Sequence, residues 1–400
     1  LYKIQIEQGA TFRQYAAEQQ LLDSTIQATR GEIYDASGIT LASTSVVWTI
    51  WADPSYSTAL FTSQTAEETG EVLKTVDETT LAEVSRQITL RLLSGDGESL
   101  DRVDTSSAEY QTQYQTVHDA LSKNGSSYQV LATKVNNAVK LSIEKYISEY
   151  NKNHAKAKTL EDGTVIKKGR ISVSSSKSFQ RDYPYGAFAA SVLGFCNSDG
   201  EGAYGLEKYY NETLAGTPGR SVAETDVNGN ALASGQSDLH EAIDGNDLYL
   251  TIDENVQAIV EQYLTEAMNT FTVHGRGSAI VMNVKTGAIL AMASIEQFDP
   301  NDPYKITDAK MTAILDKEEI DAEDIDWLEG RLGEKAFKDI IADGKISRDK
   351  TVDEDGNEVA SEYTQLQGMM REAQWKNKNI TELYMPGSVF KLITASAGLD

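Results

Sequence analysis

Cysteine and histidine are scarce in this chain, and long apolar runs are absent. Cys196 is the only cysteine among 400 residues, which excludes an intramolecular disulfide and a cysteine-rich metal site. The histidines His118, His154, His240 and His274 are scattered, and none stands at metal-ligand spacing from another. We interpret them as surface or structural residues. No signal peptide and no apolar run of about eighteen residues is present. The sequence therefore predicts no metal and no cofactor.

Positive charge is also in short supply. The chain has 61 acidic and 36 basic residues, for a formal net charge of -25. Such a field repels a phosphate backbone, so nucleic acid is not expected as a partner, and solubility is the simplest reason for the acidity. The hydrophobic fraction of 40% is sufficient for packed cores. A length of 400 residues indicates two or three domains.

The first part of the chain combines a short helix with a hairpin. We expect the helix at residues 10–20. Apolar segments at 30–35 and 39–42 flank Ser37-Gly38, which is typical of two strands joined by a glycine turn. Helical patterns then alternate with polar loops over residues 59–168. Val135, Val139, Ile143, Tyr146 and Ile147 recur at helical spacing and predict one amphipathic helix.

A different order of elements begins near residue 245. We expect a strand at 248–252, Asp253 as an N-cap, and a helix with an apolar stripe over 256–267. Segments 277–284 and 288–294 predict a hairpin of buried strands. Strand, helix, strand and strand with short links indicate an α+β fold with an antiparallel sheet packed by helices. Residues 320–332 are predicted to be helical.

The sharpest candidate site is Pro386-Gly387-Ser388-Val389-Phe390-Lys391. The Pro-Gly turn is expected to begin a helix with Ser388 in its first turn, and Lys391 then shares a face with Ser388. A serine hydroxyl is a poor nucleophile unless a base takes its proton, and a desolvated lysine can do so. We therefore predict Ser388 as an acylated nucleophile and Lys391 as its general base. The apolar neighbours Val389, Phe390, Leu392 and Ile393 are expected to bury this helix in a core.

The spacing Ser-x-x-Lys alone is a weak signal, because chance produces it often. Ser142-Ile143-Glu144-Lys145 matches it as well. That second pair lies in the middle of a predicted helix, among polar residues, and no turn precedes it. We interpret it as a surface pair with a structural role, so the context of Ser388 is what sets the two apart.

Five sequence blocks belong together with this site. They are Arg30-Gly31-Glu32-Ile33-Tyr34-Asp35; Arg181-Asp182-Tyr183-Pro184 with Gly194-Phe195; Gly202-Ala203-Tyr204-Gly205-Leu206-Glu207; Leu250-Thr251-Ile252-Asp253 with Gln257 and Thr286 to Ser294; and Trp375 to Lys391. Together these blocks resemble the class B penicillin-binding proteins, the monofunctional D,D-transpeptidases that cross-link peptidoglycan. The blocks follow the order of that family and cover about half of the chain. Two positions depart from the family pattern: Ala36 stands where arginine is usual, and Met385 where an acidic residue is usual.

The resemblance implies an organisation in two parts. Residues 1–240 are expected to form an elongated pedestal of the dimerisation type, with a helical head inserted at about 59–170. Residues 241–400 are expected to begin a transpeptidase domain of the penicillin-binding and serine β-lactamase-like fold, with an insertion at about 304–371. Both ends of the chain look cut, so we expect a fragment that is inactive by itself.

Two further triplets imitate motifs of the family. Lys285-Thr286-Gly287 precedes Ser388, whereas the pocket strand of the family follows the serine, so we interpret this triplet as a hairpin turn. Ser122-Lys123-Asn124 lies far upstream and is interpreted as a loop. The second and third active-site motifs are expected beyond Asp400.

The function implied by the resemblance is cross-linking of peptidoglycan stem peptides through an acyl-enzyme on Ser388, with covalent inhibition by β-lactams. It also implies a location at the outer face of the bacterial cell membrane, through a transmembrane anchor preceding Leu1. The implied partners are division or elongation proteins, such as a SEDS-type glycosyltransferase. An inactive scaffold or a β-lactam sensor is the alternative, and an intact Ser388 and Lys391 pair argues against the scaffold.

Overall fold

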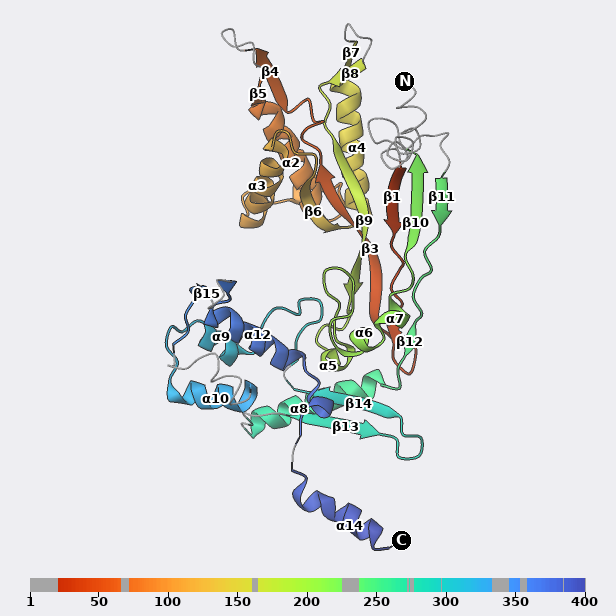
Figure 1. Ribbon diagram of the computed structural model, residues 1–400, viewed down its shortest axis with the longest axis vertical. Coiled ribbons are helices and arrows are strands. Elements are labelled where there is room, and N and C mark those ends of the chain that lie inside the picture. The colour runs from red at the N-terminus through yellow and green to blue at the C-terminus, as the bar shows by residue number, and fades with distance from the viewer. Residues whose placement is uncertain are drawn as a thin grey trace, which may run out of the picture. The chain divides into compact units, whose positions relative to one another are not determined.

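The computed structural model (Figure 1) describes residues 21–65, 72–159, 165–224, 237–271, 273, 277–295, 297–332, 345–352, 358–383 and 385–399. The predicted helix at 10–20 and His274 lie outside these residues. The chain forms two compact units: unit 1 is Leu1–Thr44 with Arg181–Asp400, and unit 2 is Ser45–Gln180. This division does not test the boundary expected between residues 240 and 241, which stays a prediction. None of the helices described is long and apolar enough to cross a membrane.

Unit 2 contains three long helices around one apolar core. A polar side chain caps each helix at its start: Asp77 accepts from the Thr80 N–H, and Ser107 and Asn136 do the same for the next two helices. The largest core side chains include Leu81, Ile88, Leu121, Leu131 and Ile143. The elements are α2 (Glu78–Leu93), η2 (Leu100–Arg102), α3 (Ala108–Ser122), α4 (Asn137–His154), β4 (Phe61–Thr65), β5 (Val72–Val76), β6 (Gln129–Val135), β7 (Lys156–Thr159) and β8 (Val165–Lys168).

The predicted amphipathic helix is present as α4, but its first member was wrong. Val139, Ile143 and Ile147 form the buried stripe of α4. Val135 instead ends strand β6, where it pairs with Trp48 of β3 (Thr40–Ala52). Apolar spacing runs across this strand–helix junction without a break, so periodicity alone places the helix start too early.

The first part of unit 1 confirms the predicted hairpin. Strand β2 (Ile33–Tyr34) pairs antiparallel with β3. Asp35 closes the turn, because its carboxylate accepts from the backbone N–H groups of Ser37 and Ile39, both at 2.7 Å. Gly38 has a φ of 84° there, which favours glycine. The predicted strand at 248–252 is shorter than expected: β12 (Leu248–Tyr249) pairs parallel with β2.

The remaining described elements before residue 241 are a three-stranded sheet, the strand β9 and three short helices. The sheet has the order β1-β10-β11 and is antiparallel throughout. Phe195 lies at the centre of the adjoining core, where its ring contacts those of Tyr204, Phe298 and Trp375. The elements are β1 (Leu21–Ile26), β9 (Val173–Asp182), α5 (Ala190–Leu193), α6 (Gly205–Tyr209), α7 (Asn211–Leu214), β10 (Gly219–Glu224) and β11 (Ser237–His240).

The predicted strand–helix–hairpin order is confirmed in the second half of unit 1. Asp253 caps α8 (Glu254–Thr270) by accepting from Asn255 and Val256. Helix α8 packs against the hairpin of β13 (Ser278–Met282) and β14 (Ile289–Ser294). The buried Gln257 joins helix to strand, since its amide exchanges two hydrogen bonds with the backbone of Met292, at 2.7 and 3.0 Å.

The expectation that both strands of this hairpin are buried was wrong for β13. Ser278, Ile280 and Met282 are exposed, whereas Ala291, Ala293 and Ser294 of β14 are buried. The physical reason is that α8 covers one face of the two strands. The alternating side chains of β13 on the opposite face have no covering layer among the described residues.

The described residues between 304 and 371 form a small helical body with its own core. Leu328, Leu366 and Met370 are fully buried in it. The helix predicted at 320–332 is confirmed as α10. The elements in this part and after it are α9 (Ala309–Leu315), α10 (Ala322–Leu332), β15 (Thr351–Val352), β16 (Glu358–Val359), α12 (Glu362–Trp375), α13 (Lys378–Thr381), η3 (Gly387–Phe390) and α14 (Lys391–Ala397).

Candidate active site

Ser388 lies in a single 3₁₀ turn, η3, that continues directly into α14. The Val389 N–H donates to the Pro386 carbonyl at 3.1 Å, which closes the turn over Gly387. Gly387 has a φ of 53°, a left-handed conformation that favours glycine. The Lys391 N–H donates to the Ser388 carbonyl. Side chains three residues apart eclipse in a 3₁₀ turn, so the backbone places Ser388 and Lys391 on one face.

This arrangement suits nucleophilic catalysis. The hydroxyl of Ser388 needs a base to take its proton, and the amine of Lys391 is the nearest candidate along the same face. The backbone N–H groups at the start of a helix favour negative charge that develops close to them. The secondary structure therefore agrees with the predicted position of Ser388 at a helix start. The catalytic roles of Ser388 and Lys391 stay predictions.

The expected burial of the apolar side chains around Ser388 was wrong. Val389, Phe390, Leu392 and Ile393 are 62%, 53%, 71% and 61% exposed. No described residue of η3 or α14 is buried. The apolar residues indicate which side chains of this helix another element would cover. Their burial also requires that such an element packs against them. The described part of the chain contains none for this helix.

The segment that leads to Ser388 is held firmly against β14 and the loop after it. The Trp375 indole N–H donates to the Pro303 carbonyl at 2.7 Å. The Asn379 amide donates to the Ala293 carbonyl at 2.9 Å, and the Asn377 amide donates to the Met292 sulfur at 3.1 Å. From the sequence, this block was recognisable only through its resemblance to the family. The structure adds that its polar side chains fix α13 to the edge of the hairpin.

A buried carboxylate joins three of the quoted blocks. Glu207 is fully buried. Its Oε2 accepts from Arg30 Nε at 2.7 Å, and its Oε1 accepts from Arg181 Nε at 2.8 Å. The Tyr183 hydroxyl also donates to Oε1, at 3.2 Å. Sequence reasoning named these residues but did not predict that they meet, because they stand far apart along the chain.

The same network controls the acidity of two neighbouring groups. Burial raises the pKa of Tyr183 well above its usual value, and the Glu207 carboxylate raises it further. Burial raises the pKa of Cys196 to about 12, and Glu207 again adds to the effect. The Cys196 thiol is therefore neutral at physiological pH, which makes it a poor nucleophile.

The serine of the second Ser-x-x-Lys pair has the structural role expected of it. Ser142 lies within α4, and its hydroxyl donates to the Gly97 carbonyl at 2.5 Å.

Lys285-Thr286-Gly287 is a hairpin turn, as predicted: the Gly287 N–H donates to the Asn283 carbonyl at 2.8 Å, and Gly287 has a φ of 76°.

Family models match most of the chain. The penicillin-binding protein dimerisation domain matches residues 25–250, which is more than half of the chain. The penicillin-binding protein transpeptidase domain matches residues 277–400. The chain belongs to the class B penicillin-binding proteins. The α+β fold expected from the sequence, a pedestal followed by the start of a transpeptidase domain, is thereby confirmed.

Two curated relatives match part of the chain. Stage V sporulation protein D of Bacillus subtilis is 38% identical over 164 residues, which are 41% of this chain and 24% of the relative. Peptidoglycan D,D-transpeptidase FtsI of Buchnera aphidicola is 41% identical over 122 residues, 30% of this chain and 21% of the relative. The match thus spans about a quarter or less of each of these relatives.

Among solved structures, penicillin-binding protein 2X from Streptococcus thermophilus is similar over 70% of this chain and 36% of that protein, with a TM-score of 0.44 and 26% identity. A peptidoglycan synthetase from Bifidobacterium adolescentis is similar over 94% of this chain and 62% of that protein, with a TM-score of 0.42 and 21% identity.

Proposed function

We propose that this penicillin-binding protein is a peptidoglycan D,D-transpeptidase that works through an acyl-enzyme on Ser388. The observation that carries the proposal is the turn of Gly387–Phe390. It places Ser388 and Lys391 on one face at the start of a helix, within the residues matched by the transpeptidase family model. Relatives named as D,D-transpeptidases support the substrate class.

The proposed reaction has two acyl-transfer steps. The Ser388 oxygen attacks the carbonyl of the penultimate D-alanine in a stem peptide, and Lys391 accepts the hydroxyl proton. The C–N bond to the terminal D-alanine breaks, and that residue leaves as an amine after receiving a proton. An amine of a neighbouring stem peptide then attacks the Ser388 ester, which forms the cross-link and restores the hydroxyl.

The same chemistry accounts for the proposed inhibition and location. A β-lactam presents a strained amide to Ser388, and opening of its ring leaves no departing group, so the ester persists. Peptidoglycan lies outside the cell membrane, so we propose that the protein acts on that side and is anchored there. Its proposed partners are membrane proteins of division or elongation, including a SEDS-type glycosyltransferase. Family membership supports these assignments.

A fluorescent penicillin tests the assignment of the nucleophile in the whole protein. We expect a covalent label that resists denaturation, with mass spectrometry locating it on Ser388. Ser388→Ala should abolish labelling. Lys391→Gln should reduce it by about 10²-fold or more, because the proton then lacks its acceptor. Ser396→Ala is the matched control: it removes a hydroxyl that bonds to the Leu392 carbonyl in the same helix, and labelling should persist.

Three results would contradict the proposal. Undiminished labelling of Ser388→Ala would place the nucleophile elsewhere. Labelling of Ser388 without any cross-linked stem dimers in a transpeptidation assay would favour a β-lactam sensor. A protein that takes no label at all would favour the scaffold.

A further inference from the structure

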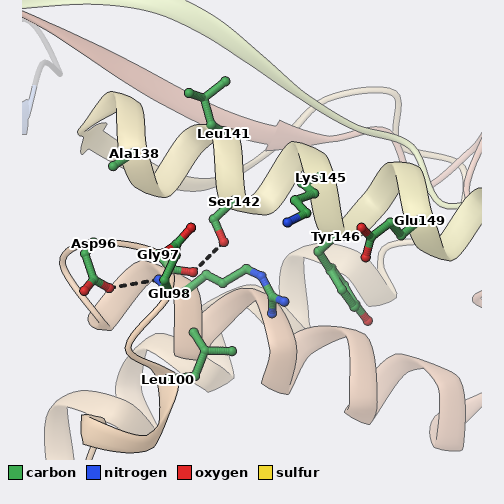
Figure 2. A pocket seen from close by; sticks show the side chains of 11 residues that line it. Asp96, Gly97, Glu98, Leu100, Ala138, Leu141, Ser142, Lys145, Tyr146 and Glu149 are labelled. Atoms are coloured by element: carbon green, nitrogen blue, oxygen red, sulfur yellow. Dashed lines mark hydrogen bonds between the residues drawn. The ribbon is translucent and has the colours of Figure 1, made fainter.

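Unit 2 contains a cavity of about 660 Å³ that has no part in the proposed reaction. Figure 2 shows α4 along one side of it and the loop that follows α2 along the other. A volume of this size falls within the range of small-molecule sites. The lining includes Arg91, Leu100, Leu141, Lys145, Tyr146 and Glu149.

The loop wall of the cavity is fixed in place. Ser142 and Asn136 both bond to backbone carbonyls of this loop, Ser142 to Gly97 at 2.5 Å and Asn136 to Gly95 at 2.7 Å. Gly97 has a φ of 76°, and a Cβ there would stand 2.6 Å from the Cβ of Ser142. A side chain at position 97 would clash with Ser142, so only glycine fits there. These contacts hold this part of the cavity wall in place before a ligand binds.

One of the acidic side chains in the wall is already committed. Asp96 accepts from the backbone N–H groups of Glu98 and Ser99, both at 2.8 Å, and from the Ser99 hydroxyl. These hydrogen bonds, led by that of the Ser99 hydroxyl, hold the pKa of Asp96 well below its usual range. Asp96 builds the loop and is not available to a ligand.

Two charged groups on α4 lack an ion pair within the described part of the chain. Lys145 and Glu149 stand four residues apart and line the cavity. In the same helix, Lys140 and Glu144 have the same spacing and form a closed ion pair at 2.8 Å. In Figure 2, Lys145 and Glu149 lie on either side of Tyr146, along the face of α4 that looks into the cavity.

Arg91 is the third charged group without an ion pair among the described residues. Its Nη1 donates to the backbone and side-chain oxygens of Gln87, at 2.8 and 2.7 Å, and its guanidinium lies 4.5 Å from the ring centre of Tyr146. Its Nε is buried without a hydrogen-bond partner. A ligand cannot reach the buried Nε, but the positive charge of the guanidinium still attracts a carboxylate in the cavity. Burial lowers the pKa of Arg91, and the neighbouring Glu149 carboxylate acts against this by raising it.

We propose that this cavity binds a short zwitterionic peptide. The peptide carboxylate binds at Arg91 and Lys145, and its amine binds at Glu149. The apolar part of the ligand lies against Leu100 and Leu141. The peptidoglycan stem is a source of such a ligand because it carries free carboxylates and an amine; this choice of source rests on the proposed function. Binding is noncovalent and separate from acylation of Ser388.

Calorimetric titration with D-alanyl-D-alanine tests the site. The whole protein is first treated with penicillin G, so that a functioning active site is blocked. We expect one saturable site with a dissociation constant on the order of millimolar, the range of weak small-ligand binding. Lys145→Gln and Glu149→Gln should each weaken binding about 10-fold. Both side chains are exposed, so the fold should persist. Lys152→Gln, an exposed change on the same helix, is the matched control.

Three related ligands test which charged groups of the peptide are bound and whether the natural ligand is a peptidoglycan stem peptide. N-acetyl-D-alanyl-D-alanine lacks the amine, the dipeptide amide lacks the carboxylate, and each should bind about 10-fold more weakly. A preference over L-alanyl-L-alanine supports the stem peptide, whereas equal binding overturns that source. Absence of saturation, or unchanged binding in both Lys145→Gln and Glu149→Gln, overturns the site itself. Loss of penicillin labelling bears only on the proposed function, so the two failures are distinguishable.

Discussion

Removal of the Glu207 carboxylate is expected to destabilise unit 1 strongly. The side chain is fully buried, and it accepts from Arg30 at 2.7 Å and from Arg181 at 2.8 Å. The two arginine side chains are only 7% and 6% exposed. Glu207→Ala would leave two guanidinium groups buried without a counter-charge, and it would free the hydroxyl of Tyr183.

The expected loss of stability depends on the hydrogen-bond acceptors that the two arginines keep after the substitution. Breaking one buried ion pair by deleting a partner costs about 3–5 kcal/mol. Each arginine keeps a backbone acceptor, since Arg30 Nη2 donates to the Glu207 carbonyl and Arg181 Nη1 to that of Gly31, both at 2.8 Å. We therefore expect a loss of about 4 kcal/mol, a large share of the 5–15 kcal/mol typical of a domain.

Urea unfolding measures the change, and hydrogen exchange with mass spectrometry assigns it to a unit. Exchange should quicken in peptides around Phe195 and Leu214, whereas the core of α2 and α4 should keep its protection. Glu212→Gln, an exposed change on α7, is the control and should cost less than about 0.5 kcal/mol. A loss below about 1 kcal/mol for Glu207→Ala would refute the reasoning.

Two further predictions concern the cavity wall and the cysteine. Gly97→Ala should lower the free energy of unfolding of unit 2 by about 1–3 kcal/mol, because it strains the backbone and clashes with Ser142. Gly125→Ala is the control and should cost less, because its Cβ meets no atom within 4 Å. Equal shifts in the melting temperature of the two variants would contradict this. Cys196 has a folded pKa of about 12, above the usual value of about 8.5, so the folded state holds this proton more tightly. Stability should fall as pH rises from about 8.5 towards 12, and Cys196→Ala should flatten that slope; parallel slopes in urea titrations would count against the assignment.

The sequence predicted a helix cap and a turn correctly, because these features depend on residues that are close together in the chain. Asp253 was predicted as an N-cap, and its carboxylate accepts from the N–H groups two and three residues later. The turn at Ser37-Gly38 was predicted from glycine between apolar segments, and Asp35 and Gly38 form it. The residues that form a cap or a turn lie within about four positions of one another, so both features can be predicted from a single sequence.

Features that depend on tertiary packing were not predictable in this way. Val135 fits the helical stripe but pairs with Trp48 in a sheet. The bond between Arg30 and Glu207 spans 177 residues, and no local rule predicts it. The exposure of Leu392 depends on whether another surface meets α14. For the candidate site, the sequence predicted the turn that holds Ser388, but not the amide contacts of Asn377 and Asn379.

The bond between Thr44 and Arg181 has a consequence for how the chain can vary. Arg181 Nη1 donates to the Thr44 hydroxyl at 2.8 Å, so the chain leaves unit 1 and returns to it at one place. A segment whose two ends meet can be lengthened, shortened or exchanged without moving its host. We therefore expect residues 45–180 to be replaceable as one segment. A short linker from Thr44 to Arg181 is the natural route to a minimal pedestal that keeps Arg30, Arg181 and Glu207 together.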